Sequence, residues 1–365
     1  MARYYATAVG GLEPILRDEI IKRLPGATVD AVLSSDAWGR TYFTCAGPPS
    51  DVLALRSVEN VFAAAGQLEG LPADESALPM IRAFVASCDL TEATTVHAAV
   101  YGPRVDPSFL CTSKRTGQHL YGSMDIMAAA GAGVQDRYGW RVDLEGYDYD
   151  IHVDVTDDRL TVGLRLTPET LRRRGRVAHV AASLNPTLGY AMCVLTDPQP
   201  HEVFVDPTCG AGTVLLERAW FGPARMIAGD LFAKPIEAAR ENLRENGVEA
   251  HLLRWDARKL PLAAESVDKL CANLPWGRRA GSHLVNKHLY PPLVREIARV
   301  LRVGGLAVLL SLEKRMLGDC LDRHGWLRVT DSFVVSVGGL KPVVFVVRKW
   351  RGQERPDEAV QGTNG

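Results

Sequence analysis

The stretch Asp206-Pro207-Thr208-Cys209-Gly210-Ala211-Gly212-Thr213 decides the fold, because it follows a short apolar run and opens a helical pattern. Its glycines permit a tight turn and let a ligand approach the backbone closely. Leu215 stands where the dinucleotide-binding fingerprint has its third glycine, and no basic residue lies beside the loop to receive a pyrophosphate. The loop therefore suits an adenosine ligand without phosphates better than a dinucleotide.

Strands and helices alternate regularly around this loop, which is typical of a doubly wound, largely parallel sheet with helices on both faces. The predicted strands are Val203–Asp206, Arg225–Gly229, His251–Trp255, Val267–Ala272 and Leu306–Leu312, and the predicted helices are Gly212–Trp220, Lys234–Asn246 and Pro292–Arg302. Two further β-rich runs, Trp326–Val337 and Pro342–Arg348, are joined by Gly338-Gly339 without an intervening helix. This spacing predicts a hairpin, so the last strand should run antiparallel.

Acidic residues follow the second and third of these strands, at the edge where ligands bind in open parallel sheets. Asp230 lies at the end of the second strand, where a carboxylate typically accepts hydrogen bonds from ribose hydroxyls. Asp256 ends the third strand and can accept from an exocyclic amine such as that of adenine. Capping of the turn before Arg258 is an equally good interpretation of Asp256 alone.

The fourth strand ends in Asn273-Leu274-Pro275-Trp276-Gly277, which predicts a second ligand site. Asn273 places a carbonyl acceptor at the mouth, and Pro275 fixes the backbone so that the Leu274 carbonyl can point the same way. Trp276 offers a flat face on which a planar base can stack. These groups suit the planar amine of a nucleobase taken out of its helix, although a turn around a buried tryptophan would have the same sequence.

The first half of the chain has a different pattern of mixed α and β elements. Its β-rich runs are Arg3–Val9, Thr41–Cys45, Thr94–Tyr101, Asp148–Val155 and Arg159–Leu166, and its helical patterns are Leu12–Arg23, Ser76–Cys88 and Gly117–Tyr138. Asp157-Asp158 reads as a hairpin turn. Glycine and proline around residues 66–72 indicate a break between two small α+β modules.

Composition limits the classes of protein that the chain can represent. Its 365 residues include 42 lysines and arginines against 43 aspartates and glutamates, so a strongly basic nucleic-acid binder is excluded and any nucleic-acid contact must come from local patches. No apolar run reaches the roughly 18–20 residues that cross a bilayer, and no signal peptide pattern is present, so we expect a cytoplasmic protein without membrane partners. The seven scattered cysteines form no CxxC pair, and we expect no metal site.

Taken together, these motifs resemble those of class I S-adenosylmethionine-dependent methyltransferases, in which an antiparallel strand ends the sheet. Asn273-Leu274-Pro275-Trp276 is similar to the (Asp/Asn)-Pro-Pro-aromatic motif of enzymes that methylate exocyclic or amide nitrogens, with Leu274 where proline is commonest. More narrowly, residues 3–350 resemble the THUMP-domain tRNA guanine-N2 methyltransferases. The segments that carry this resemblance are 11–19, 114–119, 139–144 with the hairpin at 153–166, and 171–176 with 184–188.

The resemblance implies an N-terminal ferredoxin-like module over residues 1–66, a THUMP RNA-binding domain over 67–168, an arginine-rich linker over 169–185, a Rossmann-like methyltransferase domain over 186–350 and a disordered tail over 351–365. It implies methylation of the N2 amine of a guanine in tRNA, in the acceptor stem, with S-adenosylmethionine as the cofactor. Asn273, Leu274, Pro275 and Trp276 would serve catalysis. The cofactor would be held by Asp206, Thr208, Gly210, Gly212, Thr213, Asp230, Asp256, Asn273 and Thr187.

Basic residues outside the methyltransferase motifs are candidates for contacts with RNA phosphates. They are Lys114, Arg115, Arg172, Arg173, Arg174 and Arg176, with Arg278 and Arg279 beside the predicted pocket. An ordinary solvated surface is an equally good interpretation of each one alone.

Several alternatives to this function stay open at this point. They are an N2-guanine methyltransferase acting on rRNA or on another tRNA position, an adenine-N6 methyltransferase with the same acceptors, and an RNA-binding protein with a degenerate catalytic domain. Cysteine-based C5 methylation is disfavoured, because a carboxamide motif occupies the place of the thiol and Cys271 lies in an apolar strand. A nicotinamide-dependent oxidoreductase is also disfavoured, because such an enzyme would lack the Asn-x-Pro-Trp motif at 273–276. The modified position and the oligomeric state stay open, with a monomer favoured.

Overall fold

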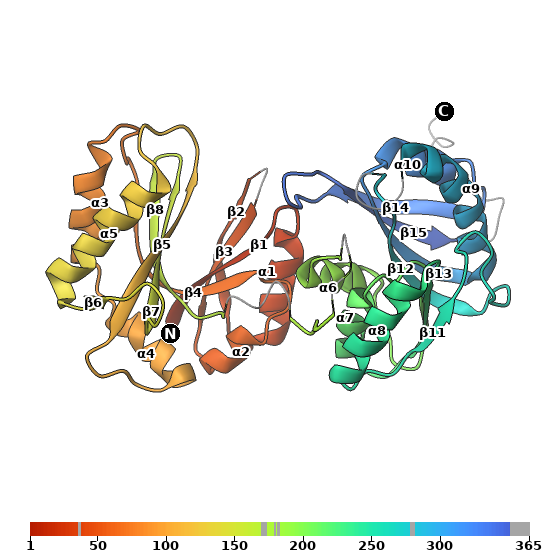
Figure 1. The fold of residues 1–365 in the computed structure, drawn as a ribbon, viewed down its shortest axis with the longest axis horizontal. Helices are drawn as coiled ribbons and strands as arrows, with labels where there is room; N and C mark the ends of the chain where they lie inside the picture. The colour runs from red at the N-terminus through yellow and green to blue at the C-terminus, as the bar shows by residue number, and fades with distance from the viewer. Residues whose placement is uncertain (36–37, 169–173, 179, 181–182, 278–281, 351–365) are drawn as a thin grey trace, which may run out of the picture. The chain divides into compact units, whose positions relative to one another are not determined.

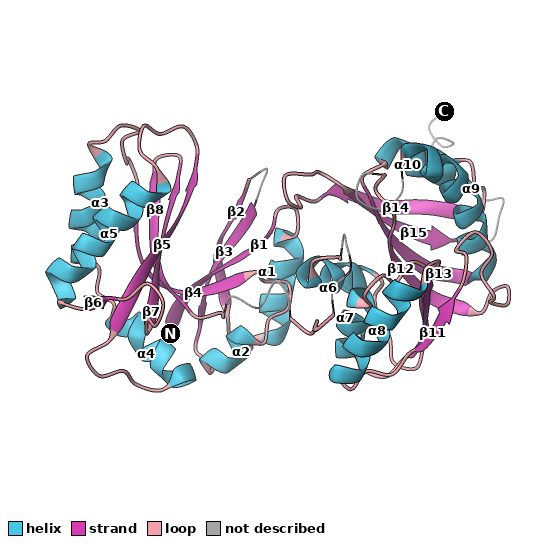
Figure 2. Cartoon of the chain, viewed as in Figure 1, coloured by secondary structure: helices cyan, strands magenta, loops and turns pink. Residues whose placement is uncertain are grey.

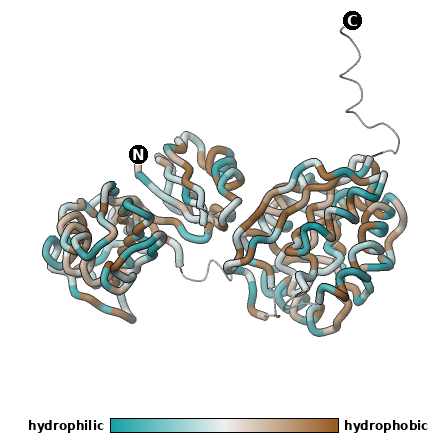
Figure 3. Tube along the Cα trace, turned by 90° about the horizontal axis from the view of Figure 1, so that it is seen from above, coloured by the Kyte–Doolittle hydropathy of each residue, from teal (hydrophilic) through white to brown (hydrophobic). Residues whose placement is uncertain are grey.

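The computed structural model describes residues 1–35, 38–168, 174–178, 180, 183–277 and 282–350. The chain divides into two compact units, each built on one β-sheet (Figures 1 and 2). The first unit comprises Met1–Ala8 and Glu13–Leu171, and the second comprises Val9–Leu12 and Arg172–Gly365. In both units, hydrophobic and hydrophilic residues alternate along the chain (Figure 3). This is the pattern of elements with one buried face.

The first unit has an eight-stranded sheet in the order β2-β3-β1-β4-β8-β7-β5-β6. Its strands are β1 (Ala2–Val9), β2 (Thr28–Ser34), β3 (Trp38–Cys45), β4 (Asn60–Leu68), β5 (Ser108–Thr116), β6 (Arg141–Val142), β7 (Tyr149–Thr156) and β8 (Arg159–Arg165). Strand β4 pairs antiparallel with β1 on one side and with β8 on the other. The break expected near residue 66 therefore lies inside a strand, and the two halves of this unit share one sheet.

Four of these strands, β2, β4, β5 and the two-residue β6, were not predicted, and for the first three the physical reason is visible. Strand β2 is mostly exposed, so it lacks the apolar alternation that marks a half-buried strand. Strand β4 contains Ala63-Ala64-Ala65-Gly66, which has low β-propensity and is held by pairing on both edges. Strand β5 ends in polar residues while pairing parallel with β7.

The prediction of a strand at Thr94–Tyr101 is wrong, because the structure has helix α4 (Thr91–Tyr101) there. Its β-branched residues favour strands, but local hydrogen bonds favour a helix. Asp89 Oδ1 accepts from the Thr91 amide at 2.9 Å, and the Thr95 hydroxyl donates to the Thr91 carbonyl at 2.7 Å. Ala93, Val96 and His97 are buried at helical spacing, so packing decides the outcome.

The other helices of the first unit are α1 (Glu13–Arg23), α2 (Pro49–Leu53), α3 (Ala77–Ser87) and α5 (Ser123–Tyr138). Helices α3 and α5 pack against each other (Figure 1). Helix α5 starts six residues later than the predicted Gly117, because the Asp125 carboxylate accepts from the Gly122 amide at 2.8 Å and so caps the helix there.

The second unit has a seven-stranded sheet in the order β11-β10-β9-β12-β13-β15-β14. Its strands are β9 (Val203–Asp206), β10 (Arg225–Asp230), β11 (His251–Arg254), β12 (Val267–Asn273), β13 (Leu301–Ser311), β14 (Leu327–Val334) and β15 (Val343–Lys349). The first five are parallel, and β15 runs antiparallel to both β13 and β14. The predicted fold class and the antiparallel last strand are confirmed.

Helices cover both faces of this second sheet (Figure 2). They are α6 (Pro186–Leu195), α7 (Thr213–Arg218), α8 (Ala233–Glu245), α9 (His283–Val300) and α10 (Lys314–Asp322). Helix α9 starts nine residues before the predicted Pro292, because the Ser282 hydroxyl caps it by accepting from the Val285 amide at 3.2 Å. None of the described helices combines the length and the apolar composition that a membrane crossing needs.

A buried ion pair ties β3 to β7 within the first unit. Arg40 contacts Asp154, and both side chains are 2% exposed. The guanidinium also donates to the Tyr42 hydroxyl at 3.1 Å and to the Thr161 hydroxyl at 3.3 Å. Because β3 and β7 are not neighbours in the sheet, this pair joins the first strands of the unit to its last ones.

Candidate active site

The glycine-containing loop after β9 contacts the ends of three parallel strands. Within it, the Thr208 amide donates to Asp206 Oδ1 at 3.0 Å, and the Thr208 hydroxyl donates to the Asn273 carbonyl at 3.3 Å. The Gly210 amide donates to Asp230 Oδ2 at 3.2 Å. The ends of β9, β10 and β12 are thus joined through one loop, as the parallel sheet order requires.

Backbone geometry explains the glycines of this loop. Gly210 has φ +52° and Gly212 has φ +79°, which favour glycine. A Cβ on Gly210 would meet only Val180 Cγ2, at 4.0 Å, among the described neighbours, so there is room beside the loop for a ligand. A Cβ on Gly212 would approach Ala239 Cβ to 3.2 Å, where α7 and α8 pack closely. The two glycines therefore serve ligand access and helix packing, respectively.

Trp255 supports the same loop and was not predicted as a site residue. Its indole Nε1 donates to the Pro207 carbonyl at 3.0 Å, and its ring lies against Gly229, where a Cβ would come within 2.5 Å of the ring. The only sequence signal was an apolar residue at the end of a predicted strand. Tertiary packing places this ring beneath the loop.

Asp206 and Asp230 differ in environment. Burial raises the pKa of Asp206 to about 8, the nearby Asp230 carboxylate adds to this rise, and the hydrogen bond from Thr208 opposes it. Asp230 accepts from the amides of Gly210 and Phe232, one on each oxygen. A carboxylate has about four lone-pair sites, so Asp230 retains acceptors for two ribose hydroxyls.

Asp256 is already engaged by its own turn. Arg258 Nη2 lies 2.6 Å from Asp256 Oδ2, and the Arg258 amide donates to Oδ1 at 2.9 Å. These hydrogen bonds and the charge of Arg258 hold the pKa of Asp256 below its ordinary range. The capping interpretation is therefore realised here, and recognition of adenine by Asp256 stays a prediction.

The Asn273 side chain carries the observation that best fits an incoming amine. Its Oδ1 is buried and accepts no hydrogen bond from the described residues, and Trp276 Nε1 is likewise buried without an acceptor among them. Buried polar atoms are usually paired, so an unpaired acceptor at the end of β12 is available to a donor from a ligand. The group that Asn273 Oδ1 requires is a donor such as –NH2.

Leu274 departs from the commoner proline for a reason that the structure makes plain. Its amide donates to the Leu310 carbonyl at 3.0 Å, and its side chain is 1% exposed within the core under β12 and β13. Proline has no amide hydrogen and could not make this bond.

Other predicted cofactor residues lie in the adjoining helices. Thr213 is the first residue of α7 and is buried, and Thr187 is buried in the first turn of α6, where its amide donates to Asn185 Oδ1 at 2.9 Å. Cys271 is fully buried, and burial raises the pKa of its thiol well above the ordinary value. A thiol in this state is not a nucleophile at neutral pH.

The predicted RNA contacts fall into three groups. Lys114 and Arg115 lie exposed on β5, with the Lys114 ammonium 5.3 Å from the centre of the Trp38 ring. Arg174 instead pairs with the buried Glu217 at 3.3 Å, and Arg176 donates to the Leu184 carbonyl at 3.0 Å. Arg172, Arg173, Arg278 and Arg279 lie outside the described residues.

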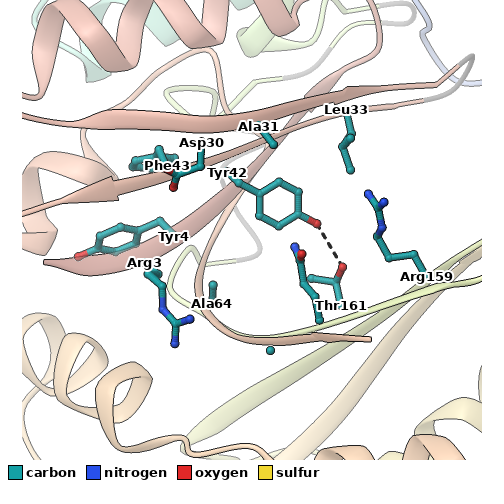
Figure 4. A pocket seen from close by; sticks show the side chains of 12 residues that line it. Arg3, Tyr4, Asp30, Ala31, Leu33, Tyr42, Phe43, Ala64, Arg159 and Thr161 are labelled. Atoms are coloured by element: carbon teal, nitrogen blue, oxygen red, sulfur yellow. Dashed lines mark hydrogen bonds between the residues drawn. The ribbon is translucent and has the colours of Figure 1, made fainter. Parts of the chain in front are cut away.

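A pocket of about 310 Å³ opens on the sheet of the first unit, between β1, β2, β3, β4 and β8 (Figure 4). Arg3 and Arg159 line it together with Tyr42 and Thr161, whose hydroxyls lie 3.1 Å apart. Arg159 pairs with Glu69 at 2.7 Å. The sequence did not predict this pocket, because its lining residues come from distant strands.

Comparison with known proteins identifies both parts of the chain. Residues 173–342 match the family model described as RMKL-like, methyltransferase domain, and residues 89–165 match the THUMP domain. The tRNA (guanine(6)-N2)-methyltransferase of Thermus thermophilus is 36% identical over 245 residues, covering 66% of this chain and 72% of the relative. The crystal structure of TrmN from Thermus thermophilus matches with a TM-score of 0.79 and 29% identity, covering 96% of this chain and all of that one.

A human relative, tRNA (guanine(6)-N(2))-methyltransferase THUMP3, is 34% identical over 257 residues, which cover 66% of this chain and 50% of the relative. The chain thus spans about half the length of this and the other mammalian THUMP3 relatives it matches. The predicted family is confirmed by the bacterial relative, and membership makes S-adenosylmethionine the methyl donor of this domain. The chain belongs to the family of THUMP-domain class I methyltransferases that includes the guanine-N2 tRNA methyltransferases.

Proposed function

We propose that this protein methylates the exocyclic N2 amine of a guanine in the acceptor stem of tRNA. The unpaired, buried Asn273 Oδ1 carries the proposal, because it is an acceptor that lacks a donor at the end of β12. The names of the relatives support the substrate, since both refer to guanine 6 of tRNA. The cytoplasmic location and the monomeric state expected from the sequence stay predictions.

The residues around the loop fit S-adenosylmethionine. The space beside Gly210 would admit its methionine and ribose portions, Asp230 would accept from the ribose hydroxyls, and Asp256 would share its carboxylate between Arg258 and the adenine edge. When bound, this cofactor supplies an electrophilic methyl group on a positively charged sulfur.

The chain's own groups would orient the target amine. Asn273 Oδ1 and the Leu274 carbonyl would accept from the two N2 hydrogens, and the Trp276 ring would stack on the extruded base. An asparagine amide cannot take a proton at neutral pH, so the rate gain would come from positioning, and the proton would leave after methyl transfer. The exposed Lys114 and Arg115 would contact phosphates.

The deciding experiment is incubation of the purified full chain with labelled S-adenosylmethionine and unmodified tRNA transcripts, followed by nucleoside mass spectrometry. N2-methylguanosine that maps to the acceptor stem is the expected product. Methyladenosine, N2-methylguanosine only outside the acceptor stem, or no transfer to the transcripts would contradict the proposal. A transcript with inosine at the target position, which lacks the N2 amine, is the matched control and should accept no label there.

A further inference from the structure

The Pro275 carbonyl is held by two buried side chains of α9. The Tyr290 hydroxyl donates to it at 2.7 Å, and Asn286 Nδ2 donates to it at 2.9 Å. Both residues have a relative exposure of 0%. A carbonyl oxygen has two lone pairs, so both are occupied here.

The hydrogen bonds around Tyr290 run in one direction. A tyrosine hydroxyl has a single hydrogen, which Tyr290 gives to Pro275. At the contact of 2.8 Å between the two hydroxyls, Ser311 must therefore be the donor and Tyr290 the acceptor. The Ser311 oxygen accepts in turn from the Glu313 amide at 2.9 Å. This chain connects the end of β13 to the loop that follows β12.

The two hydrogen bonds to the Pro275 carbonyl form a clamp that acts on ψ, the one soft backbone torsion of Pro275. The pyrrolidine ring already fixes φ of Pro275, so ψ alone sets the direction of its carbonyl and the plane of the peptide that leads into Trp276. Two donors on that carbonyl fix ψ. The Leu274 carbonyl lies on one side of this residue and the Trp276 ring on the other, so one torsion governs how the acceptor and the stacking face are placed.

Three side-chain polar atoms near this loop are buried without partners among the described residues. They are Asn273 Oδ1, Trp276 Nε1 and Asn286 Oδ1. All three lie in this loop or on a side chain hydrogen-bonded to it, so the described residues do not satisfy every polar group of the loop. The side-chain amide of Asn286 donates to the Pro275 carbonyl through Nδ2, while its Oδ1 has no partner among the described residues.

We propose that Tyr290 and Asn286 are positioning residues for methyl transfer, which hold the Asn273–Trp276 loop in its reactive geometry through the Pro275 carbonyl. The inference rests on the proposed function, since it assigns these residues to the step at that site. Neither residue needs to touch the substrate or the cofactor. Their removal should slow the chemical step and leave cofactor binding unchanged.

The test compares Tyr290→Phe with Thr196→Val in the full chain. Thr196 is also fully buried in the second unit, and its hydroxyl donates to the Cys193 carbonyl at 2.7 Å. It lies away from the Asn273–Trp276 loop, because its carbonyl contacts Lys269 near the start of β12. We expect Tyr290→Phe to lower kcat about tenfold or more, with KM for RNA and Kd for S-adenosylmethionine within about twofold of wild type. Thr196→Val should keep the wild-type kcat while lowering Tm by about as much as Tyr290→Phe does.

Ser311→Ala and Asn286→Ala complete the series. Ser311→Ala keeps the Tyr290 hydroxyl but removes the serine hydroxyl that orients it. The kcat of this variant should therefore lie between the kcat of wild type and that of Tyr290→Phe. Asn286→Ala should lower kcat with the same unchanged Kd. Equal kcat in Tyr290→Phe and Thr196→Val, or a parallel loss of cofactor affinity, would overturn the proposal.

Hydrogen exchange separates this inference from the proposed function. Without any substrate, the Leu274 amide, which donates to the Leu310 carbonyl at 3.0 Å, should exchange faster in Tyr290→Phe than in Thr196→Val, because the loop that follows it is less firmly held. Equal exchange in both variants would count against the clamp. If wild type methylates another nucleoside, the proposed function fails, whereas the kcat ratio and the exchange rates still decide the role of Tyr290.

Discussion

At the scale of single residues, Asn273 Oδ1 is a buried acceptor without a partner among the described residues, and the proposed function assigns it to the substrate amine. Asn273→Ala should reduce kcat by about a hundredfold or more, since a misplaced reacting group costs at least this much. The Kd of S-adenosylmethionine, measured by calorimetry, should stay close to the wild-type value. Asn246→Ala, the same substitution at the end of α8, is the control and should keep full activity. A parallel loss of turnover and cofactor affinity in Asn273→Ala would assign the residue a structural role instead.

The buried carboxyl group of Asp206 should make the stability of the second unit depend on pH. Its pKa is raised to about 8 by burial, whereas an unfolded aspartate titrates near pH ~4. Between these values the folded protein binds the extra proton, so the free energy of unfolding of the second unit falls as pH rises, by up to about 1.4 kcal/mol per pH unit. Asp206→Asn removes this contribution, and urea unfolding at pH 5 and pH 7.5 should show a smaller decline than in wild type.

Asp256→Asn is the matched control for this pH effect. The pKa of Asp256 is lowered, so its stabilising contribution is complete above the ordinary pKa of an aspartate and is lost only in stronger acid. Between pH 5 and pH 7.5 this variant should parallel wild type. Parallel curves for Asp206→Asn as well would show that Asp206 is not protonated in the folded protein.

At the scale of elements, the Arg40–Asp154 pair joins β3 to β7 inside the first unit. Asp154→Ala leaves a buried guanidinium without its counter-charge, which typically costs about 3–5 kcal/mol. The exposed pair of Arg82 and Asp136 links α3 to α5, and Asp136→Ala should cost much less, because water and salt screen an ion pair on the surface. Urea unfolding followed by circular dichroism would measure both, and similar losses in the two variants would refute the special role of the buried pair.

The elements also show where local sequence suffices to predict structure. Strand β9 is predicted to the residue because it is a short apolar run ended by Asp206-Pro207, and β15 follows from the glycine pair before it. Helix α4 and strands β2 and β4 are not predicted. The structure of α4 depends on capping, that of β2 on its exposure at the edge of the sheet, and that of β4 on pairing along both sides. In the candidate site, Asp230 and Asn273 are predictions from the sequence, whereas the contacts of Trp255, Asn286 and Tyr290 appear only in the structure.

At the scale of the whole molecule, the net charge of −1 averages two unlike parts. Residues 1–185 carry 18 basic and 23 acidic residues, and residues 186–365 carry 24 and 20. If RNA is the substrate, its affinity should fall steeply with salt. Lys114→Ala and Arg115→Ala should each reduce the slope of log Kd against log salt by about 1. Arg244→Ala, an exposed arginine paired with Glu245, is the control, and a flat response in wild type would argue against phosphate contacts.

The sequence alone determined the five parallel strands and three of the helices in the second unit, the antiparallel last strand and the polar residues at the strand ends, but not helices α6 and α10. These features depend on short-range periodicity, turn residues and the general rule that ligands bind at the carboxyl edge of a parallel sheet. Tertiary structure decided which polar atoms are buried without partners, which arginines pair internally and which side chains hold the Pro275 carbonyl. Those properties depend on contacts between residues far apart in the chain, such as Pro275 with Tyr290 and Arg174 with Glu217, and on burial that no local pattern records.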